Sequence, residues 1–173
     1  NDILYNYFLF NSKLTDDILR NNTNLKLSKG AKNLFSKTIS SIGDEIMENI
    51  LLQTKNITER EIQDTFINLE LPFIVTSNNK LPISKLLKIW RQKIKFNITI
   101  NAKMVLKSSL KNLMIEIAKS IHKFRNSTLY TITENDVRQI VEIIVVIKDY
   151  EKKTHKTRSV HAKERKRNKN GQF

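Results

Sequence analysis

One short stretch near the middle of the chain is rich in side chains that can bind a negatively charged partner. Five Lys and Arg side chains fall close together, at Lys85, Lys88, Arg91, Lys93 and Lys95. Such side chains neutralise phosphates and release the counterions that surround a nucleic acid. Any one Lys is as readily an ordinary solvated residue, but the cluster predicts a surface that binds a polyanion.

Residues suited to catalysis or metal binding are sparse. The three His lack partners at ligand spacing, and the chain has no Cys. The carboxylates of Asp44, Glu45 and Glu48 are better explained as a solvated helix face, because no His or further oxygen ligand lies at matching spacing. With no Ser/His/Asp pattern and no Gly-rich phosphate loop, the sequence predicts neither an enzyme nor a cofactor.

The charge of the chain points to the same kind of partner. Lys and Arg number 31 against 17 Asp and Glu, a formal net charge of +14. Residues 1–79 carry −2, residues 80–150 carry +9 and residues 151–173 carry +7. Nucleic acid is the expected partner. A membrane surface or a small-molecule substrate is not expected, and the absence of a long apolar run or a signal-peptide pattern predicts a soluble intracellular protein.

Two long amphipathic helices must position these cations. Apolar residues recur every three or four positions, a spacing that places them on one helix face. The first series is Ala31, Leu34, Phe35, Ile39, Ile42, Ile46 and Ile50, about seven turns long, and the second is Leu106, Leu110, Leu113, Ile117, Ile121 and Phe124. We expect Phe124, like Trp90, to pack in the core rather than to stack on nucleic-acid bases.

A shared motif follows each long helix. Residues 55–62 and 130–137 both read as a short extended Ile-Thr step and then a capped helix, and equivalent positions lie 75 residues apart. In each copy an acidic residue stands three positions after the capping Thr, as in a capping box. A period of this length indicates a repeated domain.

A shorter amphipathic helix is predicted before each long one. Pro82 suits the first helical position of the second copy. In the first copy, Ile3, Leu4, Tyr7 and Phe8 begin a similar segment that ends before the polar residues 21–24. Each unit is therefore short helix, long helix, short helix. One such unit cannot cover its own long helix, so we expect the two units to pack together.

The expected domain organisation follows from these elements. Residues 1–72 form the first unit, residues 73–80 a linker and residues 81–150 the second unit. Residues 151–173 form a basic tail with almost no apolar content, expected to be disordered without a partner. The fold class is all-α.

These residues resemble the core histones. The first unit resembles histone two-B through Leu27-Ser28-Lys29, residues 57–63 and Leu69-Glu70-Leu71-Pro72, and the second resembles histone two-A through residues 81–91 and 104–117. The order is similar to that of the histone doublets of some giant DNA viruses. The resemblance implies two tandem histone folds that pair within one chain as a heterodimer.

The chain also departs from this pattern. Where histone two-A inserts an Arg into the minor groove, this chain has Asn97, and Lys93 and Lys95 are the nearest substitutes. The acidic patch of histone two-A is depleted, because Lys111 and Lys119 replace two of its carboxylates while Glu116 matches one. Residues 143–150 and the tail replace its docking segment.

The resemblance implies three DNA-binding surfaces. The first joins Lys26, Ser28 and Lys29 to Tyr130 and Thr131, the second joins Lys55 and Thr58 to Lys93, Lys95 and Lys103, and the third comprises Lys85, Lys88 and Arg91. It further implies a histone four and histone three partner, wrapping of double-stranded DNA without sequence specificity, and compaction of a viral genome in the virion, the viral factory or the host nucleus. Two alternatives stay open: a protein-interaction module with the same fold, and a histone four and histone three doublet.

Overall fold

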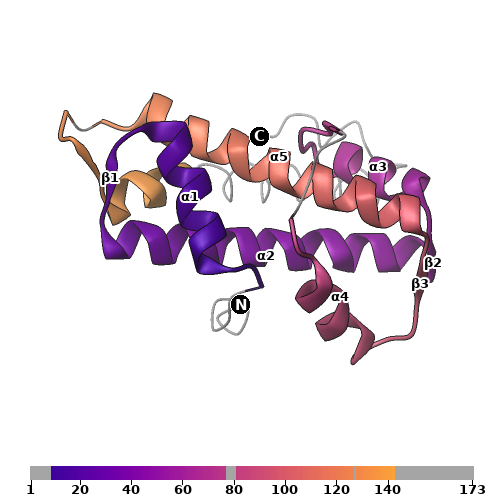
Figure 1. Cartoon of the computed structure of the whole chain (residues 1–173). Helices are drawn as coiled ribbons and strands as arrows, with labels where there is room; N and C mark the ends of the chain where they lie inside the picture. Colours follow the sequence, from indigo (N-terminus) through magenta and orange to yellow (C-terminus); the bar gives the residue numbers. More distant parts are fainter. Residues whose placement is uncertain (1–8, 77–80, 127, 143–173) are drawn as a thin grey trace, which may run out of the picture. The chain divides into compact units, whose positions relative to one another are not determined.

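The computed structural model describes residues 9–76, 81–126 and 128–142. The chain divides into two units, Asn1–Ile140 and Val141–Phe173, and the description here concerns the first. Its elements are α1 (Ser12–Thr23), β1 (Lys26–Leu27), α2 (Lys29–Gln53), β2 (Asn56–Ile57), α3 (Glu59–Asn68), α4 (Ser84–Arg91), β3 (Asn97–Ile98), α5 (Ile100–Phe124) and β4 (Thr131–Ile132). Residues 134–140 are also helical. Figure 1 shows this unit, which is mostly helical as predicted.

The two long helices are α2 and α5, each of 25 residues, and both were expected from the apolar spacing. Ser28 caps α2 by accepting a hydrogen bond from the backbone N–H of Ala31, and Thr99 caps α5 by accepting one from Ala102. An N-cap hydroxyl of this kind satisfies an amide that has no partner within the helix. Each long helix therefore starts at a residue whose side chain fixes its beginning.

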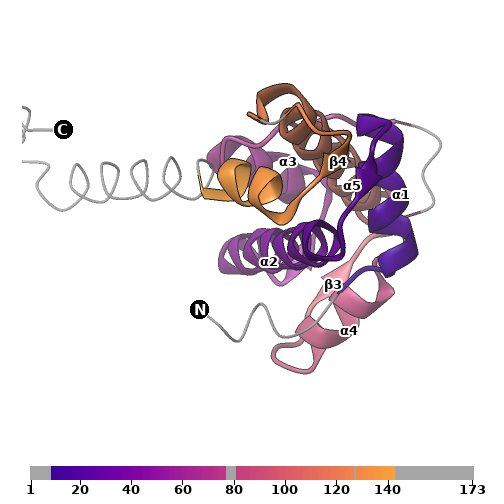
Figure 2. The same cartoon turned by 90° about the vertical axis from the view of Figure 1, so that its left-hand side faces the viewer.

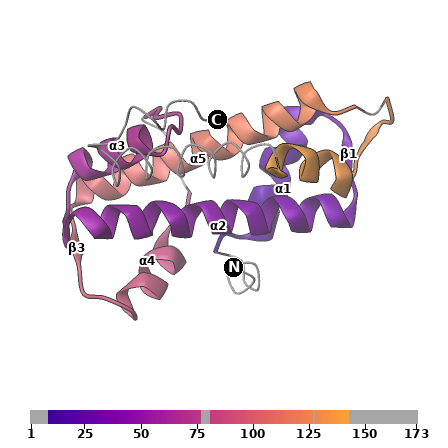
Figure 3. The same ribbon diagram turned by 180° about the vertical axis from the view of Figure 1, so that it is seen from behind.

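Two short parallel strand pairs join the halves of the chain. Lys26 and Leu27 of β1 pair with Thr131 and Ile132 of β4. The pairing of β2 with β3 brings residues 56–57 beside residues 97–98. The two pairs lie at opposite ends of the unit, with α1 near β1 and α3 near β2 and β3 (Figures 1 and 3).

The short helices of the first half pack across onto the second half. Helix α1 packs more extensively on α5 than on α2, and α3 contacts both long helices. Seen from the side in Figure 2, α1 lies beside α5 while α4 lies next to α2. The long helix of each half is thus covered partly by elements of the other half.

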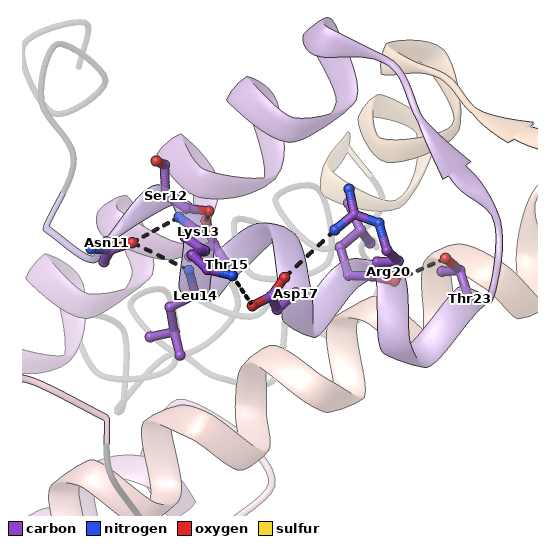
Figure 4. A network of polar contacts seen from close by, with 9 residues as sticks. Asn11, Ser12, Lys13, Leu14, Thr15, Asp17, Arg20 and Thr23 are labelled. Carbon is purple, nitrogen blue, oxygen red and sulfur yellow. Dashed lines mark hydrogen bonds and ion pairs between the residues drawn. The ribbon is translucent and has the colours of Figure 1, made fainter.

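Helix α1 differs from the sequence prediction in both its start and its end. It begins after Asn11, whose side-chain oxygen accepts hydrogen bonds from the backbone N–H groups of Lys13 and Leu14 (Figure 4). It continues through the polar residues expected to follow it as far as Thr23, whose hydroxyl donates to the Leu19 carbonyl. The next residue, Asn24, adopts a left-handed conformation and caps the helix. The predicted apolar residues Ile3, Leu4, Tyr7 and Phe8 lie outside the described residues.

The start of α4 was also predicted wrongly. Pro82 is not its first residue, since the helix begins at Ser84. Leu81 and Ile83 are both buried while Pro82 between them is exposed. The Ile83 backbone, with φ −113° and ψ 10°, is neither helical nor extended, and the helix begins only after it.

The core of the unit lies along the apolar faces of α2 and α5. The largest side chains with almost no exposure include Phe35, Phe66, Leu19, Ile46, Met47, Ile50, Ile57, Leu106 and Leu110. Phe124 was expected there but is 57% exposed, because it is the last residue of α5 and extends beyond the packed region. The segment after α3 also packs, since the Asn112 side chain donates to the Ile74 carbonyl and the Thr76 amide to the Ser108 hydroxyl.

Candidate nucleic-acid interface

A basic hollow lies at the β2/β3 end of the unit. Its volume is about 480 Å³, and its lining residues are Lys55, Asn56, Arg91, Lys95, Phe96 and Asn97. The Asn97 amide donates to the Lys55 carbonyl at 2.8 Å, so the strand pairing itself brings the cation of the first half beside those of the second. The predicted second surface is therefore assembled in part, with Arg91 added to it.

Two of the three cations of this hollow, Arg91 and Lys55, are held by contacts within the protein. The Arg91 guanidinium lies 5.1 Å from the centre of the Phe96 ring, a cation–π contact that orients its planar group. The Lys55 ammonium donates to the Leu51 carbonyl at 2.7 Å and so caps the C-terminus of α2. The Asn97 side chain donates to that of Asn56 across the strand pair. Fixed cations lose little conformational entropy when a phosphate binds.

The β1/β4 end brings together all five residues of the predicted first surface. The Lys26 amide donates to the Tyr130 carbonyl at 3.2 Å, and the Ser28 amide donates to the Ile132 carbonyl at 2.9 Å. The side chains of Lys26 and Lys29 are exposed, and that of Tyr130 is 82% exposed. Two cations and one aromatic ring therefore face solvent beside the N-terminus of α2.

A carboxylate also lies at this end of the molecule. A Cβ added to Gly30, in the first turn of α2, would lie only 2.6 Å from Oε1 of Glu134 and 3.0 Å from its Cβ. Glu134 is paired with Arg138 one turn further along its own helix. An acidic group is favourable beside a helix N-terminus, where the backbone dipoles leave a partial positive charge. This contact was not predicted from the sequence, because no local pattern links Gly30 to a residue 104 positions later.

The predicted third surface is divided by the structure. Lys85 and Lys88 are exposed on α4, whereas Arg91 belongs to the basic hollow. Lys93 was predicted to act with Lys95, but its ammonium lies 4.3 Å from the centre of the Trp90 ring. It lines a second hollow, of about 430 Å³, with Ser41, Asp44, Glu45, Glu48 and Trp90.

This second hollow corrects the interpretation of the acidic residues of α2. Asp44 is not on a solvated face, because it is 2% exposed and accepts the indole N–H of Trp90 at 2.8 Å. Glu48 is exposed as expected. Trp90 is half-buried, and its hydrogen bond ties α4 to α2. The hydrogen bond was missed because Asp44 and Trp90 are 46 residues apart in the sequence.

The two predicted capping boxes are both present. The Thr58 backbone N–H and hydroxyl donate to Oε1 of Glu61 at 2.8 and 2.6 Å, and the Thr133 amide donates to Asp136 at 2.9 Å. The Thr58 hydroxyl, followed by its backbone N–H, stabilises the charged carboxylate and lowers the pKa of Glu61 below its ordinary value. Thr58 therefore acts in the structure as a cap, and its contact with DNA stays a prediction.

Most of the predicted cations lack an acidic partner. The ion pairs found among the described residues involve Lys13, Arg20, Arg125 and Arg138. Eight of the nine predicted DNA-binding cations take part in none of these, namely Lys26, Lys29, Lys55, Lys88, Arg91, Lys93, Lys95 and Lys103. Lys103 is half-buried at the start of α5. The field of the exposed, unneutralised cations is available to an external polyanion.

One buried ion pair joins the end of α5 to the helix after β4. The Arg125 guanidinium lies 4.0 Å from the Asp136 carboxylate, and both side chains are nearly buried. Asp136 also belongs to the second capping box, so one carboxylate both caps that helix and lies beside Arg125. No role for Arg125 was predicted from the sequence, because the acidic position of the capping box was the only local signal.

Other kinds of site receive no support from the described part of the chain. Within residues 9–76, 81–126 and 128–142, no three His, Cys, Asp or Glu side chains gather in a way that would hold a metal ion. None of the helices in those ranges combines the length and apolar character that crossing a bilayer requires.

Comparison of the sequence with known proteins gives little. No protein-family model matches the chain. A curated relative, described as a probable cytosol aminopeptidase of Wigglesworthia glossinidia brevipalpis, is 31% identical over 160 residues. The match includes 88% of this chain but only 29% of that protein. The chain therefore spans less than a third of the length of that protein.

Comparison of the structure gives the clearer result. The crystal structure of the histone from Methanopyrus kandleri superposes with a TM-score of 0.64, and the superposition covers 76% of this chain and 92% of that one. The identity is 11%, so the likeness concerns the fold alone. The chain therefore has a histone-like fold.

Proposed function

We propose that this chain is a DNA-binding packaging protein built from two histone folds that pair within one polypeptide. Residues 1–72 supply the first fold, residues 81–150 the second and residues 151–173 a basic tail. The chain binds double-stranded DNA through its phosphates and without sequence specificity. The observation that carries the proposal is the cross-pairing of β1 with β4 and of β2 with β3, which places unneutralised cations at both ends of the unit.

Two further observations support the paired arrangement. The repeat of 75 residues places Ile57 and Ile132 at equivalent positions, and each is buried in its strand pair. The superposed archaeal histone covers 76% of the chain, whereas each proposed fold makes up less than half of it. The likeness therefore extends over both halves.

The chemistry of binding follows from the exposed groups. Lys and Arg side chains neutralise phosphates, and helix N-termini with their backbone N–H groups add favourable dipoles. Neither contact reads base identity. The basic hollow with Lys55, Arg91 and Lys95 is the strongest candidate for a phosphate site, because three cations from two halves of the chain line one concave surface.

A salt titration of DNA binding tests this proposal. Each neutralised phosphate contributes about −0.9 to the slope of log affinity against log salt. Replacement of Lys55, Arg91 and Lys95 by Ala is expected to flatten the slope by up to about three units. A matched control with Lys13, Lys111 and Lys119 replaced removes the same charge from other surfaces and is expected to change the slope less.

Two results would overturn the proposal. One is the absence of salt-dependent binding to duplex DNA by the unaltered chain. The other is an equal loss of slope in the two triple variants, which would indicate a general effect of net charge. Binding of folded partner proteins but not DNA would favour the alternative, an interaction module with the same fold.

The biological setting is part of the proposal. Partners of the histone four and histone three type would complete a nucleosome-like particle, as the resemblance to a histone two-B and histone two-A doublet implies. Its task would be compaction of a viral genome in the virion, the viral factory or the host nucleus. Reconstitution of the chain on DNA, with and without histone four and histone three partners, tests whether such partners complete a nucleosome-like particle.

A further inference from the structure

We propose that Tyr130, with Leu129 beside it, forms a base-stacking contact, so that the β1/β4 end binds DNA by aromatic insertion rather than by charge alone. This inference rests on the proposed DNA binding and adds to it a preference for DNA whose bases are unpaired or unstacked. The ligand class is a nucleobase in unpaired or unstacked DNA.

The first support is the exposure of apolar side chains on a fixed backbone. Tyr130 is 82% exposed and Leu129 is 60% exposed. The Tyr130 carbonyl accepts the Lys26 amide at 3.2 Å, and Ile132, two residues later, is completely buried in the strand pair. The ring is therefore presented to solvent by a backbone anchored at Tyr130 itself and at the strand pair that follows it, which reduces the entropy lost on binding.

The second support is a difference between the two ends of the molecule. In the 75-residue repeat, Tyr130 is equivalent to Lys55. Lys55 lines the basic hollow together with Arg91 and Lys95. The same position of the repeat is thus a cation at the β2/β3 end and an aromatic ring at the β1/β4 end, so the two ends cannot contact DNA in the same way.

The third support is the charge around Tyr130. Glu134 lies against the first turn of α2, where a phosphate would otherwise meet the helix N-terminus, and Arg138 is engaged by that same carboxylate. The exposed cations left beside the ring are Lys26 and Lys29. They attract a nucleic-acid strand, while the carboxylate disfavours a phosphate at the helix end. The aromatic ring then supplies the close contact.

The expected specificity follows from the physics of stacking. Every base has a π-face, and stacking on an aromatic side chain adds affinity without reading sequence. In an intact duplex these faces are covered by neighbouring base pairs, and separating them costs free energy. DNA with a mismatch or an unpaired base presents its faces at lower cost, so the chain should prefer it to paired duplex.

Competition between two DNA probes tests the inference on the full-length chain. The probes are a short paired duplex and the same duplex with two mismatched bases at its centre, labelled with 2-aminopurine beside the mismatch. The unaltered chain is expected to prefer the mismatched probe by about five-fold or more, and to change the 2-aminopurine fluorescence on binding. Tyr130→Ala should abolish the preference, so that the two probes bind with equal affinity.

Two further variants make the test specific. Tyr130→Phe keeps the ring and should keep the preference. Tyr130→Lys reproduces the residue of the other end, and should strengthen binding to paired duplex while losing the preference.

The inference fails if the unaltered chain does not discriminate between the probes, or if Tyr130→Ala still discriminates. It also fails if Tyr130→Ala changes the molar mass by light scattering, because the ring would then cover a protein contact. Failure of the proposed function would differ, since neither probe would show salt-dependent binding.

Discussion

At the scale of single residues, the two described glycines of the long helix α2 differ in the room they leave for a side chain. A Cβ on Gly30 would meet Glu134 at 2.6 and 3.0 Å, whereas a Cβ on Gly43 would meet Phe10 and Leu9 at 3.6 Å or more. Gly30→Ala should therefore gain less than an Ala normally adds to a helix, because Glu134, whose side chain is 50% exposed, must move away from the new methyl group. Gly43→Ala should stabilise it by up to about 1 kcal/mol, because Ala is the better helix former. Urea unfolding of both variants measures the difference, and equal effects would contradict the close approach of Glu134 to α2.

The cap of α3 makes the stability of the chain depend on pH. The hydrogen bonds from Thr58 lower the pKa of Glu61, so their stabilisation is complete above the ordinary pKa of a Glu and is lost as pH falls through the lowered value. Thr58→Ala should cost about 1 kcal/mol at neutral pH and less in acid. Thr58→Ser, which keeps the hydroxyl, is the control. A penalty that stays constant from neutral to strongly acidic pH would exclude this role of the hydroxyl.

At the scale of helices and strands, the halves depend on each other. Helix α1 packs mainly on α5, and both strand pairs join one half to the other. Residues 1–80 or 81–173 expressed alone should therefore show little helical signal by circular dichroism, and mixing them should restore it. A stable, cooperatively unfolding half would contradict the shared core.

The same elements show what the sequence could and could not reveal. The long helices and the capping boxes at Thr58 and Thr133 were predicted because each depends on residues a few positions apart. The bond between Asp44 and Trp90 joins the two halves, so local spacing carries no information about it. Lys93 contacts Trp90, three residues before it, and spacing alone does not distinguish this contact from a position beside Lys95. The start of α4 at Ser84 was likewise not determined by Pro82. The β1/β4 surface was anticipated only through the family resemblance, which supplied the missing tertiary pairing.

At the scale of the whole molecule, exposed cations lie at both ends of the unit Asn1–Ile140, and residues 151–173 of the sequence carry a further net charge of +7. Lys is a hydrated point charge, and Asn97 stands where the resemblance predicts a minor-groove Arg. An Arg in a narrow minor groove is held by focused negative potential, so its absence should weaken the grip on DNA. Particles formed with a histone four and histone three partner should therefore release their DNA ends readily.

Micrococcal nuclease digestion of the reconstituted particle shows whether the protein wraps DNA. We expect a discrete protected fragment, shorter than the ~146 bp of a standard octamer and shortened further by moderate salt. Digestion to a continuous smear with no protected length would contradict wrapping, and a salt-resistant fragment of full octamer length would contradict the predicted loose hold on the DNA ends.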